Sequence, residues 1–422
     1  MLVEFTVGNF LSFNQKRTLN LGAKGISELK ENIASVKTEK ILKSLVLYGA
    51  NSSGKSNLIK ALHRMREVVL SSVRLNDSDE LAYTPFLLST ETESKPTFFE
   101  IIFWQEAKRY RYGFEYDLKQ IVSEWLFVGA SEKSEKTYFI RTTEGIGIDK
   151  SKFKEGENNE SKTNDNRLFV SLVAQLGGDI SKKILAFFKG YNVLSGLEHD
   201  DYTGFTTRML HENLNGSNES LNLYQKLKLG FQDIKAIESD FNPLDLPDAL
   251  PEQLKAKLLD ELKGKRGLSL KTVHHKFNEE GDIVDLVLLD KLKNESQGTN
   301  KIIDLSGPIF DTLALGKILV IDELDAKLHP LITMRIVELF NSKESNPNNA
   351  QLIFATHDTN LLSNELFRRD QIWFTEKDEQ EQTDLYSLYD FEFPDGSKVR
   401  NDSNLERNYI RGRYGAIPFI TN

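Results

Sequence analysis

Three uninterrupted apolar runs in this 422-residue chain predict strands that are buried on both faces. They are LVL at residues 45–47, ILVI at residues 318–321 and LIFA at residues 352–355. Apolar runs without alternation are typical of the central strands of a parallel sheet. After the first run, apolar residues recur at helical spacing over residues 58–69, which predicts a helix. The pattern therefore predicts an α/β fold.

Other segments predict two further parts of the fold. Aromatic, turn-bounded segments between residues 96 and 143 resemble an antiparallel meander and predict a β-lobe. Helical patterns cover residues 167–191 and about 219–265, and the second is interrupted by FNPLDLPDALP at residues 241–251. Together these patterns predict a mixed central sheet, an antiparallel β-lobe and a helical insertion.

The loop between the first strand and its helix reads GANSSGKS, which matches the pattern GxxxxGK[ST] in full. Its glycines allow backbone N–H groups to curl around phosphate oxygens, and the helix N-terminus adds its positive dipole end. In this pattern Lys55 reaches the β- and γ-phosphates and Ser56 ligates magnesium. A Gly/Ser-rich connector is the alternative, but the flanking strand and helix favour a phosphate-binding loop. The candidate nucleotide-binding residues are Gly49, Ala50, Asn51, Ser52, Ser53, Gly54, Lys55, Ser56 and Asn57.

Residues with catalytic chemistry follow the other two runs. Asp322 would hold magnesium, and Glu323 would activate the attacking water as a general base. A solvated acidic turn is the alternative, which the upstream phosphate-binding loop disfavours. His357 would sense the γ-phosphate through one imidazole nitrogen, although a histidine in this position can also be an ordinary surface or core residue. The candidate catalytic residues are therefore Glu323, His357 and Lys55.

Composition limits the class of protein. Hydrophobic residues make up 39% and charged residues 28% of the chain, as in ordinary globular proteins. The chain has no cysteine, so disulfides and thiolate metal sites are excluded. No apolar run is long enough to span a bilayer and the N-terminus lacks a signal peptide, so we expect a cytoplasmic protein without a membrane partner. A net charge of −9 argues against a protein that binds DNA non-specifically over its whole surface. It is compatible with a local basic patch.

The order of the motifs resembles that of ABC-type ATPases of the SMC, RecF and OLD-like group. The chain has the phosphate-binding loop, a long insertion, ESQGT at residues 295–299, ILVIDELD and FATHD. The resemblance implies a head-to-tail dimer in which two ATP molecules are sandwiched. It assigns Ser296 and Gly298 to the γ-phosphate on the opposite subunit and Asp325 to a loop that crosses the dimer seam. It also implies that Gln175 senses magnesium and the attacking water, with an ordinary surface helix glutamine as the alternative.

The closest resemblance is to the AbiL- and RloA-type abortive-infection ATPases of bacterial antiphage defence. VGNFLSF, NRLFVSLVAQLG, VIDELDAKLHP and the C-terminal NYIRGRYGAIPF match that group. Only about 65 residues follow His357, too few for a Toprim nuclease domain together with the closing strands of the sheet. The resemblance therefore implies a separately encoded effector, either a Toprim-like or an HNH nuclease.

The C-terminal segment interleaves arginines with aromatic residues. Such a segment can stack on nucleic-acid bases, dock on a partner or be pinned against the core, and the small number of arginines favours the last. The residues in question are Arg407, Arg411, Arg413, Tyr409, Tyr414 and Phe419.

Three functions remain open from the sequence. The first is a magnesium-dependent ATPase that forms a homodimer or higher oligomer and regulates a separate effector in antiphage defence. The second is a RecF-like DNA-repair ATPase that holds duplex DNA, and the third is a slow ATP-binding scaffold. Intact Lys55, Asp322 and Glu323 count against an inactive scaffold.

The motifs divide the chain into four expected parts within an ABC-type P-loop ATPase head. We expect an N-terminal ATPase lobe with the P-loop at residues 1–78 and a β-lobe at residues 79–148. A helical insertion at residues 149–285 would follow, and then a C-terminal ATPase lobe at residues 286–422 with the ESQGT motif, the acidic pair and His357.

Overall fold

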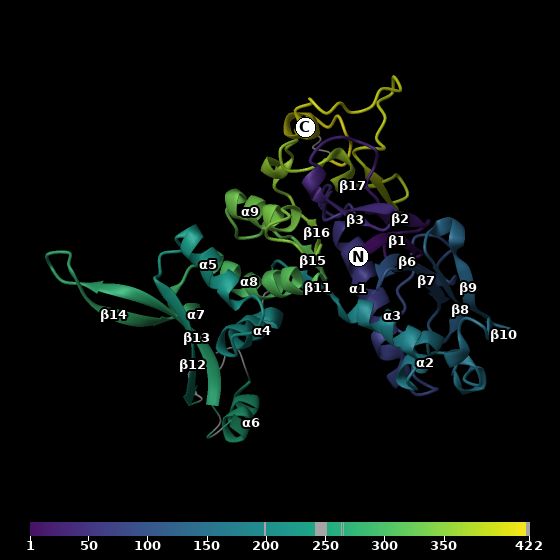
Figure 1. Cartoon of the computed structure of the whole chain (residues 1–422), viewed down its shortest axis with the longest axis horizontal. Coiled ribbons are helices and arrows are strands. Elements are labelled where there is room, and N and C mark those ends of the chain that lie inside the picture. Colours follow the sequence, from purple (N-terminus) through teal and green to yellow (C-terminus); the bar gives the residue numbers. More distant parts are fainter. Residues whose placement is uncertain (198–199, 241–250, 263, 265, 419–422) are drawn as a thin grey trace. The chain divides into compact units, whose positions relative to one another are not determined.

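A computed structural model describes the protein over residues 1–197, 200–240, 251–262, 264 and 266–418 (Figure 1). The chain forms two units. The first contains residues 1–197 and 315–422, and the second contains residues 198–314. Across the described residues, no helix combines the length and the apolar character needed to cross a membrane.

The three apolar runs form neighbouring strands of a six-stranded mixed sheet in the first unit. The strand order is β11-β15-β16-β5-β17-β18, and all neighbours are parallel except the antiparallel pair β17–β18. Every residue of β5 and β16 is buried, which explains why these strands lack alternation. The strands are β11 (Tyr191–Ser195), β15 (Ile318–Asp322), β16 (Gln351–Ala355), β5 (Ser44–Tyr48), β17 (Ile372–Lys377) and β18 (Thr383–Ser387). The predicted mixed central sheet is confirmed.

The predicted antiparallel β-lobe is also confirmed, and it is larger than expected. Its seven strands follow the order β10-β9-β8-β7-β6-β1-β2, with every neighbouring pair antiparallel. The two strands β1 and β2 come from the N-terminus, outside the expected lobe at residues 79–148. The strands are β10 (Gly145–Ile148), β9 (Lys136–Thr142), β8 (Ile121–Gly129), β7 (Lys108–Tyr116), β6 (Thr97–Gln105), β1 (Leu2–Gly8) and β2 (Arg17–Asn20). A separate hairpin joins β3 (Ile33–Val36) to β4 (Glu39–Leu42).

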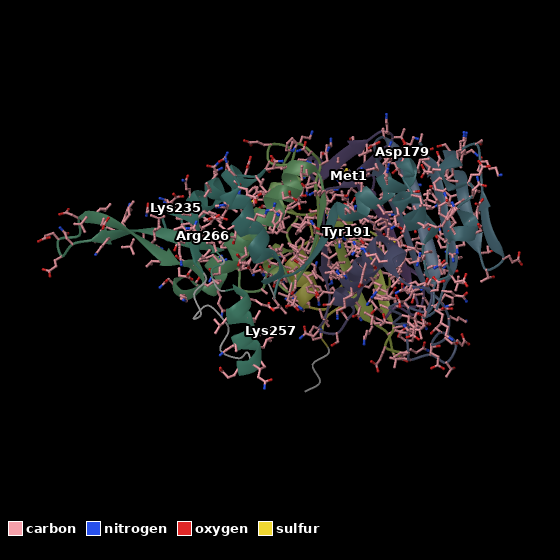
Figure 2. The ribbon with its side chains drawn as sticks, turned by 90° about the horizontal axis from the view of Figure 1, so that it is seen from below. Met1, Asp179, Tyr191, Lys235, Lys257 and Arg266 are labelled. Atoms are coloured by element: carbon pink, nitrogen blue, oxygen red, sulfur yellow. The ribbon has the colours of Figure 1, made fainter. Side chains whose placement is uncertain are left out.

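Helices of the first unit pack on both sheets. The helix α1 (Lys55–Ser71) contacts β15, and α9 (Pro330–Asn341) contacts β16 and β5. On the β-lobe, Phe103 of β6 stacks on Phe187 of α3 (Asp179–Lys189) with ring centroids 3.8 Å apart. Tyr191, labelled in Figure 2, begins β11 and donates its hydroxyl hydrogen to the carbonyl of Leu62 in α1.

A buried carboxylate joins the β-lobe to the helix α2 (Phe169–Gln175). Glu124 of β8 accepts hydrogen bonds from the backbone N–H groups of Phe169 (2.6 Å) and Val170 (3.0 Å) and from the Tyr112 hydroxyl (3.0 Å). Burial raises the pKa of Glu124, while Arg141 and these three donors oppose the rise. Glu124 thereby caps the otherwise unsatisfied N–H groups at the start of α2.

The second unit contains strands besides the helices of the predicted helical insertion. Its helices accompany a three-stranded antiparallel sheet of order β12-β13-β14 (Figure 1). The strand β12 lies inside residues 219–265, which the sequence pattern predicted as helical. Pairing with β13 overrides the helical pattern, because it buries Ile234 and Leu270 beside Tyr224 and Ile303. The elements are α4 (Asp200–His211), α5 (Ser217–Leu227), β12 (Asp233–Asp240), α6 (Glu252–Leu262), β13 (Arg266–Phe277), β14 (Ile283–Asp290), α7 (Lys291–Asn294) and α8 (Gln297–Leu315).

Two further expectations concern this part of the chain. The sequence predicted that the helical pattern is interrupted at residues 241–251. Residues 241–250 of this segment lie outside the described residues. The expected insertion began at residue 149, but α2, α3 and β11 belong to the first unit and pack with its two sheets.

The C-terminal segment after β18 is pinned to the core of the first unit. Tyr409, in α10 (Leu405–Ile410), and Tyr414 are buried, and both rings contact Phe374. These two tyrosines are therefore not available to stack on nucleic-acid bases, as the pinned interpretation predicted. Phe419 lies outside the described residues.

Candidate nucleotide-binding site

A pocket of about 320 Å³ lies at the junction of β5 and α1. It is lined by the loop residues Asn51, Ser52, Ser53, Gly54, Lys55, Ser56 and Asn57 together with Glu323 and His357. The structure thus brings the expected phosphate-binding loop, general base and phosphate sensor to one cavity. This convergence arises because β5, β15 and β16 are neighbours whose C-terminal ends share one edge of the parallel sheet.

The two glycines of the loop are required by its backbone and by close packing. Gly49 has φ 156° and Gly54 has φ 115°, in the region that disfavours L side chains. A methyl group on Gly49 would lie 2.5 Å from the Thr375 carbonyl oxygen, and one on Gly54 would overlap the side chain of Thr383. Gly54 is also the N-cap of α1, which begins at Lys55.

Lys55 points back over the loop that precedes it. Its Nζ donates hydrogen bonds to the carbonyl oxygens of Gly49 (2.7 Å) and Ala50 (3.0 Å). Burial lowers the pKa of Lys55, and the carboxylates of Asp322 and Glu323 oppose that shift. The ammonium group is therefore held within the concave side of the loop, where phosphate oxygens would lie.

A network of hydroxyl groups holds the outer side of the loop, and sequence reasoning missed most of it. Ser53 Oγ lies 2.6 Å from Thr375 Oγ1, and Thr383 Oγ1 donates to the Ser53 carbonyl oxygen (3.0 Å). Ser12 Oγ lies 2.7 Å from Thr383 Oγ1 and accepts a hydrogen bond from Asn57 Nδ2 (2.8 Å). Ser12 belongs to the VGNFLSF motif, so its role had a signal in the sequence. Nothing in the sequence around Thr375 or Thr383 marks them.

The acidic pair ends the central strand in an unusual conformation. Asp322 is the last residue of β15, and one of its carboxylate oxygens, Oδ1, is buried without a hydrogen-bond partner in the described structure. Glu323 follows with φ 53°, a left-handed conformation that costs a non-glycine residue on the order of 1 kcal/mol or more. Such strain is stored at functional sites more often than elsewhere, which agrees with the expected role of Glu323.

Gly196 supports this conformation from the neighbouring strand, and sequence reasoning missed it. Its N–H donates a 2.6 Å hydrogen bond to the Asp322 carbonyl oxygen, directly after β11. A methyl group at Gly196 would overlap the Glu323 carbonyl oxygen and lie 2.6 Å from the Glu323 carbonyl carbon. Only glycine leaves room for the backbone carbonyl groups of the two acidic residues.

His357 and Asp325 lie together on the loops after β16 and β15. The His357 backbone N–H donates to Asp325 Oδ2 at 3.4 Å, and Asp325 Oδ1 is buried without a hydrogen-bond partner in the described structure. Burial and the positive charge of Lys55 lower the pKa of His357, against the opposing effect of Asp325 and the acidic pair. The imidazole is therefore neutral at neutral pH, and one of its nitrogens can donate a hydrogen bond to a phosphate.

A protein-family comparison matches residues 44–363 to the family described as "AAA domain, putative AbiEii toxin, Type IV TA system". The chain belongs to this family. The matched region extends from β5 through the loop, the acidic pair and His357, so the whole pocket is part of the AAA domain. The expectation of a nucleotide-binding P-loop ATPase is thereby supported at the level of the domain.

Two solved structures are similar to the chain at low sequence identity. One is an SMC head bound to the C-terminal winged-helix domain of ScpA, with 15% identity, coverage of 92% of this chain and 97% of that chain, and a TM-score of 0.44. The other is the SMC head domain from Thermotoga maritima, with 11% identity, coverage of 92% and 98%, and a TM-score of 0.39. A comparison with curated proteins finds no match.

The AAA domain has donors that fit ATP and magnesium. The Ser56 hydroxyl and the buried, unpartnered Oδ1 of Asp322 are oxygen ligands of the kind that Mg²⁺ takes beside nucleotide phosphates. The described residues contain no cluster of three or more His, Cys, Asp or Glu that could hold a metal. A Mg²⁺ bound with the nucleotide needs only one or two protein carboxylates, and it would neutralise charge that develops on the phosphates.

The other expected site residues lie outside this pocket. Gln175 is the exposed last residue of α2, the helix that Glu124 caps. Ser296 and Gly298 belong to the second unit, where Ser296 Oγ accepts a 3.1 Å hydrogen bond from the Thr299 N–H and so caps the start of α8. The roles expected of these three residues stay predictions.

Proposed function

We propose that this AAA-domain protein binds ATP with Mg²⁺ and hydrolyses it. Lys55 and the loop N–H groups bind the phosphates, Ser56 and Asp322 hold the metal, and Glu323 accepts the proton of the attacking water. His357 donates a hydrogen bond to the γ-phosphate. The observation that supports the proposal best is the pocket in which loop residues 51–57, Glu323 and His357 meet.

Two substitutions in this pocket test hydrolysis separately from binding. Glu323→Gln removes the base and spares the phosphate contacts, so ATP affinity should persist while turnover is lost. Lys55→Ala removes a phosphate contact, so affinity itself should fall. Affinity is measured by titration with a fluorescent ATP analogue and turnover by phosphate release. Unchanged turnover in Glu323→Gln would remove Glu323 from its role.

We also propose that ATP joins two copies of the chain in a head-to-tail sandwich. Ser296, Gly298 and Asp325 would contact the nucleotide bound to the opposite copy. A serine hydroxyl and bare N–H groups at the start of α8 form the kind of helix N-terminus that binds anions.

A double variant tests the sandwich. The Glu323→Gln protein should form an ATP-dependent dimer, and adding Ser296→Arg should abolish it because the arginine fills the space for the phosphate. Sedimentation with and without ATP measures both. Equal ATP-dependent dimerisation of the two proteins would contradict the trans contact.

The biological role that we propose is regulation of a separately encoded effector nuclease, Toprim-like or HNH, in antiphage defence. The family description, with its toxin and its Type IV TA system, supports a place in such defence. ATP binding and hydrolysis then shift the protein between two arrangements, and an effector that prefers one of them is switched.

Co-expression with the product of a neighbouring gene tests this role. The chain alone should be harmless and cut no nucleic acid, and Glu323→Gln and Lys55→Ala should both alter the effector's activity in cells. Metal-dependent nuclease activity in the purified chain that disappears with substitutions at Glu376, Asp378 and Asp384 would overturn the separate-effector model.

A further inference from the structure

The C-terminal segment lies against the phosphate-binding loop. A second cavity, of about 340 Å³, is lined by loop residues 50–53, by residues 375–377 at the end of β17 and by residues 416–418 of the C-terminal segment. Loop residues 51–53 line both this cavity and the nucleotide pocket. The loop therefore forms a wall between the two cavities, and the C-terminal segment can hold it from outside the nucleotide pocket.

The hydroxyl group of Tyr409 connects the C-terminal segment to the loop. It donates a 3.1 Å hydrogen bond to the Ala416 carbonyl oxygen, and the backbone N–H of Gly49 donates to it. Burial raises the pKa of Tyr409 to about 12, and the hydrogen bond from Gly49 opposes the rise, so the hydroxyl keeps its hydrogen at neutral pH. A hydroxyl can accept one hydrogen bond and donate another, whereas a phenylalanine ring can do neither.

Gly49 transmits this contact to the lysine of the loop. It is buried, its N–H faces Tyr409, and its carbonyl oxygen accepts a 2.7 Å hydrogen bond from Lys55 Nζ. A buried N–H group that loses its acceptor is costly, so removal of the hydroxyl favours another orientation of Gly49. That orientation also sets the carbonyl that Lys55 contacts. Tyr409 can therefore act on the phosphate-binding lysine through Gly49.

The helix α10 also contacts the segment that follows β16. The Tyr409 ring packs on Tyr48, the residue before the loop, with ring centroids 5.6 Å apart. Tyr48 donates its hydroxyl hydrogen to the carbonyl oxygen of Asp358 (3.0 Å), directly after the expected phosphate sensor. Glu406 of α10 accepts a 3.2 Å hydrogen bond from the Thr359 hydroxyl in the same segment. The helix thus contacts the phosphate-binding loop and the segment of the sensor together.

We propose that Tyr409 is a positioning residue that holds the phosphate-binding loop in the shape that ATP requires. This role rests on the proposed ATP binding, and it adds a residue that lies far from every motif of the site. The expected effect is on affinity, because a loop that is fixed beforehand does not have to be ordered when ATP binds. Turnover of bound ATP depends on Asp322 and Glu323, which lie at the end of β15.

Tyr386 of β18 provides a matched control. Its hydroxyl lies 2.8 Å from the Tyr414 carbonyl oxygen and 3.1 Å from Glu376 Oε2, so it also holds the C-terminal segment. Neither of these partners belongs to the loop. Tyr386→Phe and Tyr409→Phe therefore each remove one hydroxyl that holds the C-terminal segment, and Tyr409→Phe also removes the acceptor for the loop.

Amide hydrogen exchange, followed by mass spectrometry without nucleotide, tests the contact itself. In Tyr409→Phe, the peptide that contains Gly49 should exchange roughly three- to tenfold faster, because its N–H has lost a hydrogen bond. In Tyr386→Phe, this peptide should exchange as in the unmodified chain. Unchanged exchange in Tyr409→Phe, or equally faster exchange in both variants, would overturn the proposal.

ATP binding and turnover test the consequence. Tyr409→Phe should weaken the affinity for a fluorescent ATP analogue roughly three- to tenfold and raise KM in parallel, with kcat within about twofold of the unmodified chain. Tyr386→Phe should keep the affinity, although urea unfolding shows a loss of stability in both variants. A merely structural role of Tyr409 would give two variants of equal affinity, and that result would overturn the proposal.

The two measurements separate this proposal from the proposed function. An unmodified chain that binds no ATP would contradict the proposed function, and the exchange of the Gly49 peptide would then decide on the contact with Tyr409. A chain that binds ATP with the same affinity in the unmodified form and in Tyr409→Phe would leave the proposed function intact and overturn the positioning role.

Discussion

Replacing Gly196 by alanine is expected to slow ATP turnover and to leave ATP affinity nearly unchanged. Gly196 lies outside the phosphate-binding loop and contacts the backbone of Asp322 and Glu323. The substitution therefore acts on the position of the expected general base and leaves the phosphate contacts of Lys55 in place. It separates the positioning of Glu323 from nucleotide binding.

The magnitude follows from the space at Gly196. The added methyl group would lie 2.6 Å from the Glu323 carbonyl carbon and 2.7 Å from the Asp322 carbonyl oxygen. Contact without overlap needs about 3.5 Å, and the Glu323 carbonyl oxygen lies nearer to the added methyl group than either of these atoms, so the Glu323 carbonyl group must move by more than about 1 Å. A displacement of that size at a reacting group costs on the order of a hundredfold in rate. Overpacking of this kind also lowers the free energy of unfolding by about 1–3 kcal/mol.

The assay compares three quantities for Gly196→Ala and for a control, Gly25→Ala. Turnover is followed by phosphate release at saturating ATP, affinity by titration with a fluorescent ATP analogue, and stability by urea unfolding. A methyl group on Gly25 meets no atom within 4 Å, so this variant should match the unmodified chain in all three. The reasoning is refuted if Gly196→Ala keeps full turnover, or if its affinity falls in parallel with its rate.

Three further predictions concern the loop, the β-lobe and pH. Gly54→Ala should weaken ATP binding at least about tenfold, because the methyl group overlaps Thr383 at φ 115°; equal titration curves would contradict this. Glu124→Ala leaves two buried N–H groups and a hydroxyl without their acceptor and should cost about 3–5 kcal/mol in urea unfolding, whereas a loss under about 1 kcal/mol would exclude a central role. Because the pKa of His357 is lowered in the folded chain, its imidazole is protonated at a higher pH in the unfolded chain than in the folded chain. Stability relative to His357→Gln should therefore fall as pH drops below about 6.5, and a constant difference between unfolding at about pH 7.5 and about pH 5.5 would contradict the shift.

The sequence determined those parts of the site that depend on local backbone chemistry. The loop from Gly49 to Ser56 needs small residues and positive φ angles within one short segment, and that requirement is visible as a motif. The apolar runs before the loop, the acidic pair and His357 predicted buried parallel strands, because a strand covered on both faces excludes polar residues along its whole length. The family match over residues 44–363 includes the loop, the acidic pair and His357.

Tertiary structure decided which distant residues support the site. Thr375 and Thr383 lie more than 300 positions after Ser53 in the chain. They contact it because β17 pairs with β5 and β18 pairs with β17. Gly196 matters because β11 pairs with β15, and a glycine after a strand has no local signature of that contact.

In the second unit, the tertiary structure overrides a local sequence pattern. The strand β12 lies where the local pattern favoured a helix, and it became a strand because β13 offered backbone partners and a place to bury Ile234. The spacing of apolar residues along a segment reflects the secondary structure that the segment favours by itself. The partner that satisfies its hydrogen bonds and covers its apolar face is chosen by the fold as a whole, and that choice placed β12 beside β13, left β14 at the edge and brought Gly196 against Glu323.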